Sequence, residues 1–196
     1  MTDMTFSCSC GALAGTITDV GPKDGDYVYC HCHDCQAFAV LLGAQDRVLE
    51  QAMGTALYQT RCARLSFSAG KDKLACVHLT EKPTLRWYAA CCDTPLFNTY
   101  ANGKLPYTTV LLANCDADGR TALGQTRGHL HLDDAKGDKT DLKPMSMGKL
   151  LRSFFPRLLK DIFSGDWRRN ALFDAKTFAP IASPRRLSRE ERDALV

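Results

Sequence analysis

The stretch Tyr29-Cys30-His31-Cys32-His33-Asp34-Cys35-Gln36 gathers three cysteines and two histidines. Side chains two apart on an extended strand face the same way, so Cys30 and Cys32 should point together. The next three residues turn the chain, which lets Cys35 reach the same point. Three thiolates in this arrangement predict a site for a thiophilic ion, and zinc is the default because it accepts a tetrahedral sulfur shell. The alternative is three reduced cysteines packed as small apolar side chains.

The number of sulfurs predicts which kind of zinc site this is. Structural zinc sites use four protein ligands, whereas catalytic sites use three and keep one position free. Cys30, Cys32 and Cys35 supply three and therefore favour the open, catalytic kind. His31 should lie on the opposite strand face and is not expected to bind the ion. His33, inside the turn, is predicted to be an outer group or proton shuttle, with a solvated loop histidine as the alternative.

A second group of cysteines is spread along the chain. Cys8 and Cys10 should face the same way, and the distant pair Cys91-Cys92 follows a predicted strand. Adjacent cysteines in an extended chain point to opposite faces, so both could share one ion only from a bent turn. The sequence predicts a structural site with Cys8, Cys10 and Cys92, with its fourth ligand left open and Cys91 as a candidate. Cys62, Cys76 and Cys115 stand among apolar residues and are predicted to be packing residues.

The order of these motifs carries a resemblance. Cys8-Ser9-Cys10-Gly11, then Cys30 to Cys35, then Cys92-Asp93-Thr94-Pro95-Leu96-Phe97 resembles the glutathione-dependent formaldehyde-activating enzyme family, which includes centromere protein V. That family's pattern runs CxCG, CxCxxC and CxxCG, and the similarity covers roughly residues 6–100. The resemblance implies a β-tent fold with a structural zinc, mapped to Cys8, Cys10 and Cys92, and a catalytic zinc, mapped to Cys30, Cys32 and Cys35. It also implies a carbon–sulfur lyase type of reaction that joins glutathione and formaldehyde as S-hydroxymethylglutathione.

Two positions depart from the family pattern. Ala89 stands where the family has the first cysteine of CxxCG, and Asp93 stands where it has the glycine. The structural site is therefore expected to be three-coordinate, to recruit Cys91, or to be lost. One zinc ion is expected at Cys30, Cys32 and Cys35, and the second site is left open.

The elements that position these cysteines are short. Strand-length apolar segments separated by turn residues predict a compact all-β core of antiparallel strands over about residues 5–133. The apolar run 37–42 fits a buried strand or a helical turn equally well. A charged linker follows at 134–144. In 145–196, apolar residues recur at helical spacing and predict a basic, amphipathic helical extension packed on the core, interrupted at Pro156.

Composition limits the cellular setting and the partners. Ten cysteines with no signal peptide at the N-terminus and no apolar run near ~18 residues predict a cytoplasmic protein with reduced thiols and no transmembrane segment. Residues 1–144 carry 14 Lys/Arg against 16 Asp/Glu, whereas residues 145–196 carry 11 against 6. Two basic doublets with little aromatic interleaving argue against nucleic-acid binding.

Two functions follow as hypotheses. In the first, an open zinc site binds a small thiol such as glutathione for addition to a small aldehyde, with Cys32 and His33 as the catalytic residues. In the second, the protein is a zinc-stabilised binding module without catalytic activity. Its C-terminal arm would then serve a protein, membrane or nucleic-acid partner. The sequence does not predict the oligomeric state.

Overall fold

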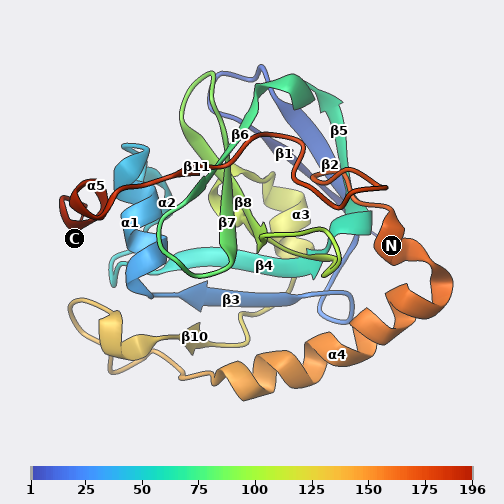
Figure 1. Ribbon diagram of the computed structural model, residues 1–196. Coiled ribbons are helices and arrows are strands. Elements are labelled where there is room, and N and C mark those ends of the chain that lie inside the picture. Colours follow the sequence, from blue (N-terminus) through green and yellow to red (C-terminus); the bar gives the residue numbers. More distant parts are fainter. Residues whose placement is uncertain (1, 196) are drawn as a thin grey trace.

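The computed structural model describes residues 2–195 and is built mainly from strands in two sheets (Figure 1). The smaller sheet has the order β1 (Thr2–Ser7), β2 (Ala14–Val20), β5 (Leu65–Ala69). The larger sheet has the order β10 (His129–Leu130), β3 (Asp26–Cys30), β4 (Thr55–Arg61), β9 (Tyr107–Leu111), β8 (Thr94–Tyr100), β7 (Thr84–Ala89), β6 (Leu74–His78), β11 (Arg185–Arg186). The prediction of a mainly β fold is confirmed.

Antiparallel pairing prevails within both sheets, as the sequence predicts. The two edge strands of the larger sheet are exceptions, because β10 pairs parallel with β3 and β11 pairs parallel with β6. Strand β10 ends after two residues. His131 takes a left-handed backbone conformation, with φ of 56°, which a continuing strand cannot accommodate.

The larger sheet packs on both of its faces. Side chains alternate between faces along a strand, and this separates neighbouring residues into different cores. Tyr58 of β4 and Val110 of β9 belong to the core shared with the smaller sheet. Leu57 and Leu111, one residue away from them, belong to a second core on the other face. This second core contains the residues that surround Cys30 and Cys35.

Five helices and several 3₁₀ turns complete the described part of the chain. The helices are α1 (His33–Leu41), α2 (Gln45–Val48), α3 (Ala117–Ala122), α4 (Met147–Ser164) and α5 (Arg189–Asp193). The 3₁₀ turns are Cys62–Arg64, Lys71–Lys73, Leu112–Asn114, Leu132–Asp134 and Asp166–Arg168. The apolar run 37–42, which the sequence left as a strand or a helical turn, is therefore helical as far as Leu41. Ser188 and Glu191 form a capping box at the start of α5.

The predicted interruption at Pro156 is wrong, because α4 runs as one helix from Met147 to Ser164. Proline lacks the N–H that would bond to the carbonyl of Arg152, four residues earlier. Arg152 and Pro156 are both exposed, so water can reach the side of the helix on which that bond is lost. The helix ends where Gly165 adopts a left-handed conformation with φ of 77°.

One face of α4 is fixed to the core by buried polar contacts and by apolar packing. Arg61 Nη1 lies 2.8 Å from Asp161 Oδ1, and Arg157 Nη1 donates to Asp26 Oδ2 over 2.6 Å. Leu150 packs in the second core, and Figure 1 shows α4 running along the outside of β3 and β10. The division into 5–133, 134–144 and 145–196 stays a prediction. Among the helices of residues 2–195, none has the length and apolar character needed to cross a membrane.

Candidate metal centres

The change from β3 to α1 brings three sulfurs together. Cys30 ends β3, Cys32 is the N-cap residue of α1, and Cys35 lies in the first helical turn. Their Sγ atoms all lie within 4.8 Å of one another, with Cys30 and Cys32 3.4 Å apart. Zinc–sulfur bonds of about 2.3 Å place neighbouring sulfurs of a tetrahedral shell about 3.8 Å apart. The donor type and the spacing therefore fit zinc, and this three-cysteine cluster could hold a metal ion.

A buried arginine faces the three-cysteine cluster. Arg86 of β7 approaches Cys35 Sγ with Nη1 at 3.5 Å and donates to Asn98 Oδ1 over 3.1 Å. Asn98 in turn donates to Thr109 Oγ1 over 2.9 Å, which fixes the amide and hence the guanidinium. Burial alone would lower the pKa of Arg86, but the charges of Cys35 and Cys32 raise it above its usual value. The cluster thus has a permanent positive charge beside it.

The thiols of this cluster have different acidities. Hydrogen bonds from Cys30 and Cys32 hold the pKa of Cys35 well below its usual value, and Arg86 adds to this effect. The hydrogen bond with Cys32, the contact with Cys35 and burial raise the pKa of Cys30. Of the three thiols, the surroundings therefore favour ionisation most at Cys35, the sulfur beside Arg86. A bound metal would hold all three as thiolates, because metal ligation requires the deprotonated sulfur.

A cavity of about 310 Å³ opens onto the three-cysteine cluster. Its wall combines the three cysteines and Arg86 with mostly apolar side chains from strands and from α4, among them Val28, Leu57, Leu130, Leu150 and Phe154. Gln59 also lines the cavity. Its Oε1 atom is buried and has no hydrogen-bond partner within residues 2–195. An unpaired buried acceptor in a cavity wall is suited to a hydrogen bond from a ligand.

The histidines near the cluster lie in different places. His31 is fully buried, with Nδ1 3.1 Å from the Ala52 carbonyl and Nε2 2.9 Å from His129 Nδ1, so both ring nitrogens are engaged away from the sulfurs. His33 is exposed, and its Nε2 lies 3.2 Å from Asp134 Oδ1. The residues that line the cavity include His131 and not His33. Catalytic roles for Cys32 and His33 stay predictions.

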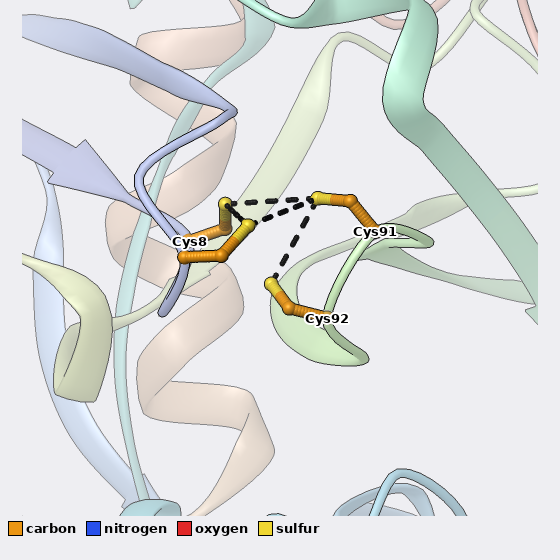
Figure 2. A group of neighbouring side chains, drawn as sticks. Cys8, Cys91 and Cys92 are labelled. Atoms are coloured by element: carbon orange, nitrogen blue, oxygen red, sulfur yellow. Dashed lines mark hydrogen bonds between the residues drawn. The ribbon is translucent and has the colours of Figure 1, made fainter.

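The second group of cysteines also converges. Cys8 and Cys10 lie in the turn after β1, and Cys91 and Cys92 lie in the turn between β7 and β8. The Sγ–Sγ distances are 3.5 Å for Cys8–Cys10, 3.9 Å for Cys8–Cys91, 3.5 Å for Cys10–Cys91 and 3.8 Å for Cys91–Cys92. Figure 2 shows the sulfurs of Cys8, Cys91 and Cys92 directed toward one another across the gap between the two turns. This four-cysteine cluster has the donors for a closed tetrahedral site.

The local backbone explains how the β7–β8 turn supplies two sulfurs. Asp93 takes a left-handed conformation with φ of 49°, the region that a glycine would occupy most easily and that Asp tolerates better than most residues. Ala89, at the end of β7, is fully buried, and its carbonyl accepts from Cys92 N–H over 3.3 Å. Of the three alternatives left open by the sequence, the geometry favours recruitment of Cys91.

Hydroxyl groups give the four-cysteine cluster its own acidic thiol. Burial raises the pKa of Cys92, but hydrogen bonds from the hydroxyls of Ser9 and Thr94 outweigh this and bring it to about 5. Desolvation by neighbouring atoms, together with the hydrogen bonds to Cys10, Cys92 and Cys8, raises the pKa of the exposed Cys91 to about 12. Cys62, Cys76 and Cys115 are buried and belong to neither cluster, as the sequence predicts.

The sequence hypotheses did not include Arg86, Gln59, Tyr107 or His131, which all line the cavity. The position of Arg86 between the apolar residues Leu85 and Trp87 was a usable signal, since a charged side chain inside an apolar segment needs a partner. His131 and Tyr107 have no comparable signal, because their position depends on how distant strands meet.

Comparisons with known proteins provide little beyond the family. No curated protein matches the chain. One matching solved structure is the crystal structure of a Rhodobacter sphaeroides protein, a structural genomics target, which is 16% identical. The alignment covers 62% of this chain and 96% of that chain, with a TM-score of 0.42. A model of a family of unknown function, DUF6151, matches residues 2–181, and the chain therefore belongs to that family.

Proposed function

We propose that the protein is a zinc-dependent enzyme of the carbon–sulfur lyase type, joining a small thiol such as glutathione to a small aldehyde. One observation carries the proposal: three cysteines with zinc-compatible spacing lie in the wall of a cavity, and they supply one ligand fewer than a closed site needs. The β-tent fold and a relationship to the formaldehyde-activating family belong to the same proposal. The order and spacing of the cysteine motifs support them.

In this reaction a carbon–sulfur bond forms between the thiol and the carbonyl carbon, and the thiol proton ends on the carbonyl oxygen. Cys30, Cys32 and Cys35 would hold the zinc ion, as predicted. Zinc at such a site supplies Lewis acidity and lowers the pKa of a thiol that enters its coordination shell.

Arg86 supports this chemistry by its charge. Three thiolates around a divalent ion leave a net charge of about −1, which disfavours a further anionic sulfur. Arg86, with Nη1 3.5 Å from Cys35 Sγ, offsets this charge at short range in a buried setting. It therefore favours a thiolate ligand in the cavity over a neutral thiol.

Other groups in the cavity wall can position the reactants and move a proton. Burial raises the pKa of Tyr107, so its hydroxyl stays protonated and can donate to the oxygen that becomes the product hydroxyl. His131 lines the same cavity and can accept the thiol proton. The unpaired Oε1 of Gln59 can accept a hydrogen bond from the thiol substrate.

The test is thiol-dependent consumption of formaldehyde by the zinc-loaded protein, with glutathione as the first thiol and smaller thiols as comparisons. We expect adduct formation by the wild type and its loss in Cys32→Ser. Cys76→Ala, which removes a buried sulfur outside both clusters, is the matched control and should keep activity. Full metal content and full turnover in Cys32→Ser would overturn the proposal, as would the absence of adduct with every thiol tested.

A further inference from the structure

Only part of the apolar face of α4 packs on the core, and the rest is exposed. Leu150 and Phe154 point inward and are buried. A second row of large apolar side chains follows the helix on its outer side, with Phe163 86% exposed. We call this row the outer stripe: Met147, Leu151, Phe155, Leu159, Ile162 and Phe163. Spacings of three and four residues place it along one side of the helix.

Charge on α4 is divided between its two sides. The exposed charged residues of the helix are Lys149, Arg152 and Lys160, which are all basic. The single acidic residue of α4, Asp161, is turned inward and is paired with Arg61 at 2.8 Å. The outer side of the helix thus combines apolar and cationic groups without a carboxylate of its own. Interfacial helices on anionic membranes share this composition.

The outer stripe reaches the cavity. Met147 and Leu151 belong to the stripe and also line the cavity, and Tyr100 on the facing strand does so as well. These three side chains are 42–45% exposed, so the cavity opens to solvent beside the stripe. A surface that covers the stripe would therefore lie next to the cavity mouth.

We propose that the outer stripe of α4 docks the protein on the surface of an anionic membrane. The apolar side chains would enter the boundary between headgroups and acyl chains, and Lys149, Arg152 and Lys160 would contact lipid phosphates. The helix would lie along the surface, with the cavity mouth close to it. This inference goes beyond the proposed reaction and holds whether or not the cavity is catalytic.

Charge argues against a second copy of the chain as the occupant of the stripe. A twofold interface places the same surface of both chains in contact. Lys149, Arg152 and Lys160 of each chain would then meet the same residues of the other, without an exposed carboxylate on the helix to pair with them. Like charges facing each other across an interface are unfavourable.

The first experiment measures flotation of the full-length protein with phosphatidylcholine vesicles, with and without about 30 mol% phosphatidylglycerol. We expect binding to the anionic vesicles that weakens as salt rises from about 0.05 to about 0.5 M. Leu159→Ser/Phe163→Ser should lower partitioning about tenfold or more, because both side chains are exposed and supply apolar area. The matched control Val40→Ser/Ile181→Ser, at residues 38% and 39% exposed outside α4, should bind like the wild type.

A second pair of variants tests the charges. Lys149→Glu/Lys160→Glu should weaken binding to anionic vesicles about tenfold or more. Lys71→Glu/Lys73→Glu makes the same charge change in the turn between β5 and β6, at the opposite end of the molecule from α4, and should have little effect (Figure 1). Circular dichroism and metal content show that each variant is folded.

Two results would overturn the proposal. One is a failure of the vesicle test, either because the wild type binds neither vesicle or because Leu159→Ser/Phe163→Ser binds as well as the wild type. The other is a wild-type dimer, seen by light scattering, that Leu159→Ser/Phe163→Ser converts to a monomer while no vesicle binding occurs. That second result would assign the stripe to a second copy of the chain.

Discussion

The two cysteine clusters use the same donor atom in contrasting surroundings. The four-cysteine cluster lies at the surface, with Cys10 and Cys91 exposed, and joins turns that are 83 residues apart in the sequence at Cys8 and Cys91. The three-cysteine cluster comes from six consecutive residues, with Cys30 and Cys35 buried against a cavity. A metal ion in the first would connect distant segments, whereas a metal ion in the second would face a cavity.

The neighbouring groups reinforce this difference. Around Cys92 the polar partners are the hydroxyls of Ser9 and Thr94, which satisfy the sulfur without adding charge. Beside Cys35 the partner is Arg86, a fixed charge held in place by Asn98. A closed shell of four thiolates around a divalent ion would carry a net charge of about −2, which hydroxyl hydrogen bonds can disperse, whereas an open site that receives a further anion benefits from a fixed cation. Donor number and nearby charge together therefore distinguish the two clusters, and they favour a structural role for the first and, under the proposed function, a catalytic role for the second.

The largest expected effect is on turnover. Cys30→Ser should remove one metal from the three-cysteine cluster, so that elemental analysis falls from two zinc ions per chain to one. Turnover should fall by about 10²- to 10³-fold, the range seen when a main electrostatic contributor is lost. Thermal stability should change little, because β3 and α1 are adjacent in the chain and need no metal to stay together. Two zinc ions in this variant would contradict the comparison.

The next largest effect is on stability. Cys92→Ser should lose the other metal and with it the link between β1 and the β7–β8 turn. Loss of a structural metal is among the changes that reach about 4 kcal/mol, which corresponds to roughly 10 °C in a domain of this size. Turnover per metal-loaded molecule should stay within about twofold, since distant sites act independently. Calorimetry and the activity assay give both values; an unchanged Tm with lost activity would reverse the roles of the clusters.

Much of this comparison was predictable from local sequence. Three cysteines within residues 30–35 are close in space for almost any backbone, so their spacing alone predicts the three-cysteine cluster. Short apolar segments separated by turn residues also predict the all-β core. The partner of Cys8 and Cys10 is harder to predict from the sequence, because recruitment of Cys91 depends on a turn in which Asp93 adopts a left-handed conformation. The continuity of α4 through Pro156 depends on which side of the helix is exposed.

The surroundings of the site were not predictable in this way. Arg86 reaches Cys35 from a strand more than 50 positions along the chain, and His131 reaches the cavity from the end of β10, which pairs with β3 although it lies about a hundred positions later in the chain. No periodicity encodes such contacts, because they arise from the order of strands in the sheet. The sequence therefore supports an ion site better than it supports a reaction at that site.

Arg86 supplies the third test of the comparison. Arg86→Met should lower turnover about 10- to 100-fold, the equivalent of losing one hydrogen bond to a charged group, while two metals remain bound. Arg86→Lys should recover part of the loss, because it keeps the charge and gives up the fixed geometry. Elemental analysis and a glutathione titration check this prediction. If Arg86→Met kept its turnover, charge would not distinguish the open cluster from the closed one.

The smallest expected effect concerns α4, whose side chains line the cavity at the three-cysteine cluster but not the four-cysteine cluster. Phe154 of α4 lines the cavity and packs edge-on against Tyr107, with ring centroids 5.6 Å apart. Phe154→Ala should make opening of the cavity easier by about 1–2 kcal/mol, so a chromophoric chelator should remove the metal of the three-cysteine cluster roughly tenfold faster. The release phase of the four-cysteine cluster, assigned with Cys30→Ser, should not change.

Phe155→Ala is the matched control for this measurement. It deletes the same ring from the next residue of α4, which is exposed and does not line the cavity. If α4 acts on the metal only as a cover, both release phases of this variant should match those of the wild type. Equal acceleration of the two phases in Phe154→Ala would mean that the whole domain had loosened. Selective acceleration would locate the effect at the cavity, because a general loss of stability exposes both clusters.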